Sequence, residues 1–310
     1  MSAVIHIEHL SKNFAGLQAV DDLSFSVSAG EVYGFLGQNG AGKSTTMRML
    51  MTLIRPSSGT IRVFGKDIAH HRREVLGKIG AIIEKPDLYK YLTAMQNLRI
   101  MAQVSGLQPT DAELLVQLDR VGLRERAHSR VKTFSQGMKQ RLGIACALTH
   151  NPELIVLDEP TNGLDPQGIA DIRNLILHLS REDGKTVFVS SHLLSEIEMI
   201  ADSMLIIDKG RKVTEGKVSE LLNPSHTLVQ LETLHDDAAR EVLRSSAWAE
   251  NVQAQENGIV LKMHKNDIPM LISHLTHRQV QIVAVQPKHS LEDFFLSLTT
   301  ANQNVAAYKN

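Results

Sequence analysis

The stretch GQNGAGKST, residues 37–45, decides the fold. It holds three glycines, a lysine and two hydroxyl side chains in nine residues. Its spacing, G-x-x-x-x-G-K-[ST], is that of a phosphate-binding loop, and it is set by Gly37, Gly40, Gly42, Lys43 and Ser44. Glycines permit positive φ, so backbone amides can turn inward around an anion. The pattern predicts that Lys43 reaches the β and γ phosphates of a nucleotide and that Ser44 binds magnesium.

The flanking sequence has the order that such a loop requires. An apolar run, EVYGFLG at residues 31–37, predicts a buried strand before it, and TTMRMLMTL at residues 45–53 predicts a helix after it. The start of that helix adds the positive end of its dipole to the anion site. The alternative interpretation is a glycine turn before an amphipathic helix.

A second feature lies in ELIVLDEPTNGLDP, residues 153–166. An apolar strand there ends in Asp158 and Glu159, and ligands of open α/β sheets bind at the carboxyl ends of strands. Asp158 suits a magnesium-supporting role, and Glu159 suits a general base that acts on water near the γ-phosphate. The structural alternative is a strand that ends in two solvated carboxylates.

The rest of the chain reads as two α/β domains. Short strands are predicted in the first 70 residues and a helical stretch at about 88–150. Two apolar strands separated by a helix follow. This order predicts a parallel pair of strands joined by a crossover helix. Beyond about Leu222 the pattern changes to short strands that alternate with helices. One of the predicted helices is SLEDFFLSLTT, residues 290–300. We therefore expect a nucleotide-binding domain at 1–220 and a small accessory α/β domain at 221–310.

Composition excludes several classes of protein. Lysine plus arginine number 33 against 34 acidic residues, which gives no sign of a nucleic-acid partner. The single cysteine, Cys146, allows no internal disulfide and is interpreted as a small buried hydrophobe. The N-terminus does not read as a signal peptide, and no window approaches the roughly 20 apolar residues of a membrane-spanning helix.

Four motifs in order, GQNGAGKST, FSQGMKQRL, LIVLDEPTNGLDP and VSSHLLSE, resemble those of the nucleotide-binding subunit of an ABC transporter. The resemblance covers about the first 220 residues. It implies a P-loop NTPase core with a helical subdomain, ATP and Mg²⁺ as cofactors, and ATP hydrolysis. It also implies a homodimer, or a heterodimer with a related ATPase subunit, that works with a transmembrane permease. Such a subunit is cytoplasmic and peripheral on the inner face of the cell membrane.

FSQGMKQRL is similar to the family's LSGGQ element, which implies that Ser135 and Gly137 meet the γ-phosphate held by the opposite subunit. The sequence departs from that element at Phe134, Gln136 and Met138. Read without the resemblance, Ser135 is an ordinary cap of the helix that follows.

Other family roles fall on single positions. The resemblance implies that His192 contacts the γ-phosphate and holds the attacking water, that Asp165 crosses the dimer interface, and that Phe14 stacks on adenine. Taken alone, these residues read as a hydrogen-bonded histidine, a turn aspartate before proline and a hydrophobe near a strand end. The remaining loop residues are also expected to contact the nucleotide: Gln38, Asn39, Ala41 and Thr45.

Glu84, in IGAIIEKPDLY, stands where most of the family has a glutamine that touches magnesium. A carboxylate is a better ligand for a hard cation than an amide, yet it adds negative charge beside a triphosphate. We therefore expect Glu84 to change metal affinity or coupling to the permease. Without the alignment, Glu84 reads as a solvated loop acid.

The same glutamate, FSQGMKQRL and the C-terminal extension resemble a branch of exporters for bacitracin, other antimicrobial peptides and drugs. The alternative is a soluble ABC-type ATPase with a regulatory, non-transport role. A family member that acts on ribosomes usually carries two cassettes in one chain, whereas this chain has a single cassette. A DNA-repair member would insert a long coiled coil between Lys43 and Ser135, where this chain has only a short segment. For the C-terminal domain we expect a role in dimer stabilisation or regulation.

Overall fold

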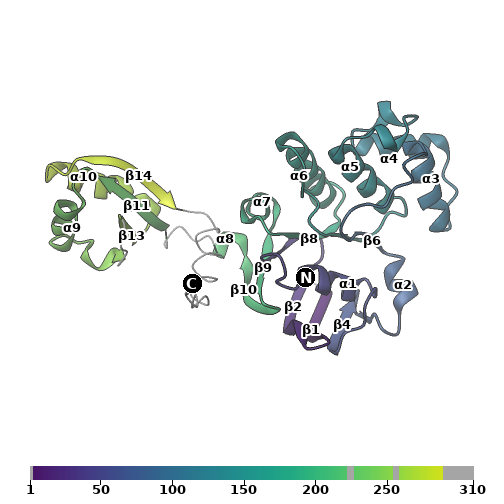
Figure 1. Ribbon diagram of the computed structural model, residues 1–310, viewed down its shortest axis with the longest axis horizontal. Coiled ribbons are helices and arrows are strands. Elements are labelled where there is room, and N and C mark those ends of the chain that lie inside the picture. The colour runs from purple at the N-terminus through teal and green to yellow at the C-terminus, as the bar shows by residue number, and fades with distance from the viewer. Residues whose placement is uncertain (1–2, 222–226, 254–257, 289–310) are drawn as a thin grey trace, which may run out of the picture. The chain divides into compact units, whose positions relative to one another are not determined.

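The structure is a computed structural model, and it describes residues 3–221, 227–253 and 258–288 (Figure 1). The chain divides into two compact units, Met1–Lys217 and Val218–Asn310. The predicted helix at 290–300 lies outside the described residues. No helix in the described ranges combines the length and the apolar character needed to span a bilayer.

A six-stranded sheet forms the centre of the first unit. Its order is β10-β9-β3-β8-β7-β6, and every neighbouring pair is parallel except β9 and β10. The strands are β3 (Val32–Leu36), β6 (Ile79–Ile82), β7 (Leu154–Leu157), β8 (Thr186–Ser191), β9 (Ser203–Asp208) and β10 (Arg211–Lys217). Every residue of β3, β7 and β8 is buried, as expected for parallel strands covered on both faces.

Helices follow three of the parallel strands, whose carboxyl ends lie at one edge of the sheet. These are α1 (Lys43–Leu50), which follows β3, α6 (Pro166–Arg181), which joins β7 to β8, and α7 (Leu194–Ile200), which joins β8 to β9. The predicted parallel pair with a crossover helix is therefore confirmed. The loops after β3, β6, β7 and β8 carry nearly all the predicted nucleotide-binding residues of the first unit, as open α/β sheets do.

An antiparallel sheet completes the core of this unit. Its order is β2-β1-β4-β5, formed by β1 (Ala3–Phe14), β2 (Leu17–Ser28), β4 (Ser58–Val63) and β5 (Lys66–Asp67). The pattern of GTIRVFGKDI, residues 59–68, suggests one short strand, but the structure has two, because Phe64 and Gly65 turn the chain at positive φ. Phe25 stacks on Tyr33, Phe35 and Phe188, with ring centroids 5.7–5.9 Å apart, and so joins this sheet to the parallel one.

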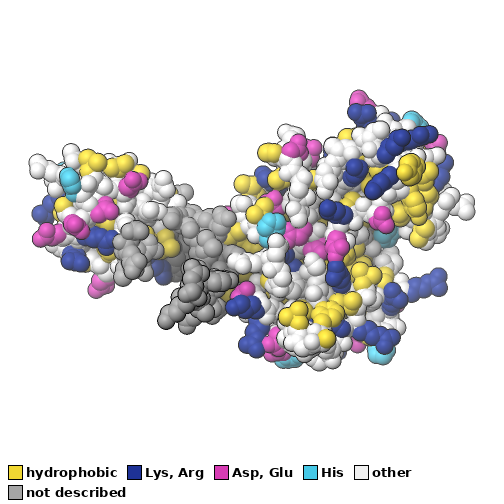
Figure 2. All heavy atoms as spheres, in the orientation of Figure 1, with side chains coloured by type: hydrophobic (Ala, Val, Ile, Leu, Met, Phe, Trp, Pro, Cys, Tyr) yellow, Lys and Arg dark blue, Asp and Glu magenta, His cyan; other side chains and the backbone are white. Residues whose placement is uncertain are grey.

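The stretch expected to be helical holds three α-helices, gathered beside the β6 edge in Figure 1. They are α3 (Ala94–Val104), α4 (Asp111–Arg120) and α5 (Gln136–Ala147); α2 (Arg72–Leu76) precedes β6, and two 3₁₀ turns, η1 (Arg124–Arg126) and η2 (Val131–Thr133), lie between α4 and α5. Thr93 and Thr110 begin α3 and α4 with complete capping boxes. Side chains of both charge signs are interspersed over the visible face of this unit (Figure 2).

The second unit is a small sheet with helices. Its four antiparallel strands have the order β12-β13-β11-β14. The elements are α8 (Val218–Leu221), β11 (Thr227–Thr233), α9 (Asp236–Arg244), η4 (Ala249–Asn251), β12 (Val252–Gln253), β13 (Ile259–Met263), η5 (Lys265–Asp267), α10 (Ile268–His277) and β14 (Ile282–Lys288). A separate core joins α9 and α10 to the sheet through Leu243, Leu271 and Leu275. The overall α/β class predicted from the sequence is confirmed.

Candidate functional site

Residues 37–45 form the turn from β3 into α1. Gly40 and Gly42 have φ of 84° and 109°, a region that glycine enters without steric cost. A Cβ atom on Gly42 would lie 2.6 Å from the carbonyl oxygen of Ala19, so the loop requires glycine there. Gly42 caps α1 without a side chain, which leaves the first amides of the helix free to face an anion.

A cavity of about 500 Å³ opens over this loop. It is lined by the predicted residues Phe14, Gln38, Asn39, Gly40, Gly42, Lys43, Ser44, Thr45 and Glu159, together with Leu17, Gln18, Ala19, Asn162 and Lys209. Phe14, at the end of β1, is 43% exposed, and the Lys12 ammonium lies 4.8 Å from its ring centroid. The structure therefore brings an exposed aromatic ring, a glycine loop and a carboxylate to one hollow.

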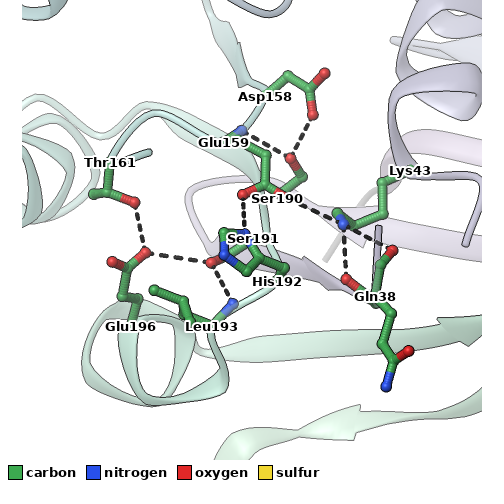
Figure 3. Close-up of polar contacts among 11 residues, drawn as sticks. Gln38, Lys43, Asp158, Glu159, Thr161, Ser190, Ser191, His192, Leu193 and Glu196 are labelled. Atoms are coloured by element: carbon green, nitrogen blue, oxygen red, sulfur yellow. Dashed lines mark hydrogen bonds and ion pairs between the residues drawn. The ribbon is translucent and has the colours of Figure 1, made fainter. Parts of the chain in front are cut away.

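Lys43 is the centre of the polar contacts in this hollow (Figure 3). Its Nζ donates to the carbonyl oxygens of Gly37 at 2.7 Å and Gln38 at 3.2 Å, and lies 3.0 Å from Glu159 Oε1. The Lys43 side chain is only 6% exposed and that of Glu159 only 18%. The ammonium is thus surrounded by oxygen atoms, which an anionic phosphate could replace.

Glu159 is held in place by three neighbours. Its Oε2 lies 2.5 Å from His192 Nδ1, its Oε1 contacts Lys43, and its backbone amide donates to Ser190 Oγ at 2.9 Å. The backbone has φ 49°, a left-handed conformation that is uncommon outside glycine. Strand β8 supplies Ser190, and the segment after it supplies His192, so the contact requires β7 and β8 to be neighbours.

Asp158 is 2% exposed, and it accepts a hydrogen bond from Ser190 Oγ at 2.6 Å. We call Lys43, Asp158, Glu159 and His192 the buried acid cluster. The Ser44 hydroxyl and the Asp158 carboxylate are hard oxygen donors that fit Mg²⁺. Across the described ranges, no group of three or more His, Cys, Asp or Glu side chains forms a metal cage. Mg²⁺ is usually held by one or two carboxylates and by the phosphates of a bound nucleotide.

Glu84 does not line the cavity. It has φ 68°, and its Oε1 pairs with the Arg48 guanidinium of α1; the two side chains are 58% and 41% exposed. The structure therefore places Glu84 beside α1 and pairs it with a cation.

Ala41 is buried within the loop itself, and three other predicted residues, Ser135, Gly137 and Asp165, lie away from the cavity at the N-terminal ends of two helices. Ser135 is exposed and caps α5 by accepting from the Met138 amide at 3.2 Å. Asp165 is exposed and caps α6 by accepting from the Gly168 amide at 3.0 Å. A Cβ atom on Gly137 would lie 3.9 Å from Gly168 Cα, so these two helix ends are adjacent. We call Ser135, Gly137 and Asp165 the exposed cap cluster.

Two further groups support the site and were not predicted. Ser190 joins Asp158 to Glu159, as described above. Glu196 of α7 accepts from Thr161 Oγ1 at 2.6 Å and from Ser191 Oγ at 3.2 Å, which ties the loop before α6 to the segment that carries His192. The motif VSSHLLSE contains Ser190, Ser191 and Glu196, but it did not indicate which distant residues they would contact.

Cys146 lies in α5 and is half-buried. Burial raises the pKa of its thiol to about 12, so it stays protonated at physiological pH. The interpretation of Cys146 as a small buried hydrophobe holds in part, because its side chain is half-buried.

Comparison with known proteins gives a consistent result. The family described as "ABC transporter" matches residues 20–162. The chain is 40% identical to the uncharacterized ABC transporter ATP-binding protein YhcH of Bacillus subtilis (strain 168), over 96% of this chain and 97% of that protein. It is 39% identical to the bacitracin transport ATP-binding protein BcrA of Bacillus licheniformis, over 96% of this chain and 98% of that one.

A solved structure described as the dimeric structure of MJ0796, a bacterial ABC transporter cassette, is also similar to the chain. It has 25% sequence identity and a TM-score of 0.63, and the match covers 69% of this chain and 98% of that one.

Proposed function

Because the chain belongs to the family of ABC transporter ATP-binding subunits, we propose that two copies of it use ATP hydrolysis to drive export through a separate membrane permease. Residues 1–220 are the ATPase, and residues 221–310 stabilise or regulate the dimer. The expected cargo is an antimicrobial peptide or a similar drug-like compound.

The observation that carries the mechanism is the threefold contact of Lys43 with Gly37, Gln38 and Glu159 at the mouth of the glycine loop. A lysine with oxygen partners on three sides is placed to exchange them for phosphate oxygens. Since Glu159 is one of those partners, phosphate binding to Lys43 also releases the carboxylate that acts next.

The phosphates bind to the amides of residues 37–45 and to Lys43. Phe14 packs on the base at the edge of the cavity. Ser44 and Asp158 hold Mg²⁺, which neutralises charge on the β and γ phosphates when it is bound. Ser190 keeps Asp158 oriented through its 2.6 Å hydrogen bond.

Hydrolysis then requires a base and a group that holds the base. Glu159, once separated from Lys43, accepts the proton of the attacking water. His192, 2.5 Å from Glu159, holds the carboxylate toward the γ-phosphate and contacts that phosphate. Charge from Lys43 and the loop amides stabilises the phosphoryl group as it is transferred.

The exposed cap cluster supports dimer formation. Ser135, Gly137 and Asp165 lie outside the cavity of their own chain, at helix N-termini that attract anions. In a two-fold dimer one interface closes both sites, with the cap cluster of each chain over the loop of the other. The likeness to a dimeric cassette supports this arrangement.

The permease is a separate chain, and the ATPase binds it from the inner face of the membrane. The name of the relative BcrA supports bacitracin or a related peptide as the cargo. In the test, the chain is expressed in a bacitracin-sensitive strain together with a candidate permease, meaning a membrane protein whose gene adjoins that of the chain. We expect both to co-purify and the strain to tolerate several times more bacitracin; Glu159→Gln in the same pair should give no protection.

Protection that survives Glu159→Gln would remove ATP hydrolysis from the proposal. Co-purification without any change in tolerance to bacitracin and related peptides would leave an ABC transporter with a different cargo.

A further inference from the structure

Two glutamates end neighbouring strands of the parallel sheet in the same way. Ile82 of β6 and Leu157 of β7 are partners in the strand register, and Glu84 and Glu159 each stand two positions beyond them. Both glutamates have left-handed backbones, with φ of 68° and 49°. Such conformations are strained for side chains larger than glycine and are found where the surrounding structure holds them.

Each glutamate is paired with a cation of the same helix. Lys43 contacts Glu159 and Arg48 contacts Glu84, and both cations belong to α1, directly after the phosphate-binding loop. The two pairs differ in exposure: the first is nearly buried, while Arg48 and Glu84 are 41% and 58% exposed. An exposed pair separates easily, because water solvates both ions.

Arg48 lies four residues after Ser44 in α1. Residues at this spacing share one helix face, with Cβ atoms about 5–6 Å apart. The Glu84 carboxylate is therefore held by a residue that stands one helical turn along α1 from Ser44, whose hydroxyl we assign to Mg²⁺. It has the oxygen donors that the metal prefers, but in this arrangement they face a guanidinium.

We propose that Arg48 is a positioning residue that competes with Mg²⁺ for Glu84 and so sets how tightly the nucleotide-loaded protein holds the metal. The inference rests on the proposed function, because it takes Ser44 and Asp158 as the metal site. When nucleotide and metal bind, Glu84 leaves Arg48 and turns toward the metal. Arg48 also supplies the positive charge that offsets the extra carboxylate in the nucleotide-free protein.

The test is a titration with Mn²⁺ that is monitored by electron paramagnetic resonance. The protein is first saturated with AMP-PNP, a non-hydrolysable ATP analogue. The full-length chain is compared with Arg48→Ala, Arg48→Lys, Glu84→Gln and the double variant Arg48→Ala/Glu84→Gln. Removal of an exposed partner should tighten Mn²⁺ binding about two- to fivefold in Arg48→Ala. Arg48→Lys should lie between that variant and the unmodified chain.

The double variant separates competition for Glu84 from simple charge repulsion. If Arg48 acts through Glu84, Arg48→Ala should change Mn²⁺ affinity little when residue 84 is already glutamine. Arg55→Ala is the matched control, because it removes the same charge from an exposed position beyond α1 and should leave the affinity unchanged.

Unchanged Mn²⁺ affinity in Arg48→Ala, or an equal change with and without Glu84, overturns the inference while the proposed function stands. If the unmodified chain with AMP-PNP binds no Mn²⁺, the proposed metal site is wrong and the inference fails with it.

Discussion

The buried acid cluster and the exposed cap cluster hold their polar groups in opposite ways. Lys43, Asp158 and Glu159 are largely shielded from water, and each has side-chain or carbonyl partners from distant parts of the chain. Ser135 and Asp165 are exposed, and their side chains accept from the amides three residues further along their own helices. The first cluster is therefore assembled within a single chain, whereas the second presents helix ends to solvent.

The difference teaches which steps a single chain can perform. A loop with its lysine and acids in place can bind nucleotide alone. The helix ends lie outside the cavity over the loop, and under the proposed function their contribution requires a second chain. Substitutions in the two clusters should consequently have different signatures, which the following experiments separate.

The largest effect is expected in the buried acid cluster. Glu159→Gln keeps the shape of the side chain but removes the base, so turnover should fall by a factor on the order of 100 to 10,000. ATP binding should be retained, because the glycine loop and Lys43 are intact. Steady-state ATPase assays and calorimetric titration with ATP measure the two quantities. Turnover within a fewfold of the unmodified chain would show that another group is the base.

Lys43→Ala tests binding within the same cluster. Loss of a charged donor to phosphate should weaken ATP affinity by about 10- to 100-fold, on the scale of a hydrogen bond to a charged group. Calorimetry on the isolated chain checks this. An unchanged dissociation constant would contradict the assignment of the loop as the phosphate site.

The exposed cap cluster should respond differently. Ser135→Ala should leave ATP affinity of the open protein unchanged but lower turnover about tenfold, because a hydrogen bond to the opposite γ-phosphate is lost. It also removes a helix cap worth about 1 kcal/mol of stability, so a thermal unfolding curve is recorded beside the ATPase rate. Weaker ATP binding in the open protein would place Ser135 in the site of its own chain and break the comparison.

The smallest effect is expected at Glu196, which joins the loop before α6 to the segment that carries His192. Glu196→Gln should lower kcat about fivefold, since a weaker acceptor loosens the tie between the Thr161 loop and the His192 segment. KM for ATP should stay within about twofold, because Glu196 does not line the nucleotide cavity. A change in KM with constant kcat would contradict a positioning role.

The local parts of this arrangement were predictable from the sequence. The strand–loop–helix at residues 31–53 and the cap at Ser135 follow from local composition and spacing, and the structure has both. The resemblance named His192, and the structure brings it to Glu159.

The tertiary contacts were not predictable. Strand β6 has only four residues and includes Gly80, which packs against the backbone of residue 147, so its pattern is too short to identify. The pairing of Arg48 with Glu84 joins residues 36 apart, and the left-handed turn at Glu84 has no marker such as glycine. Strands β9 and β10 were not predicted, although SMLIID in β9 is an apolar run of the length of a strand.

The central claim is that a second chain completes the nucleotide pocket. The test compares Glu159→Gln with the double variant Glu159→Gln/Ser135→Asp. Each is passed through gel filtration with ATP and Mg²⁺, the ATP that stays bound is measured, and light scattering gives the particle mass. Aspartate caps a helix as well as serine but sets a negative charge against the γ-phosphate. The account predicts that the single variant retains ATP in particles of twice the 34.3 kDa chain mass and that the double variant loses it. ATP retained by single chains, or retained equally in both variants, would contradict the account.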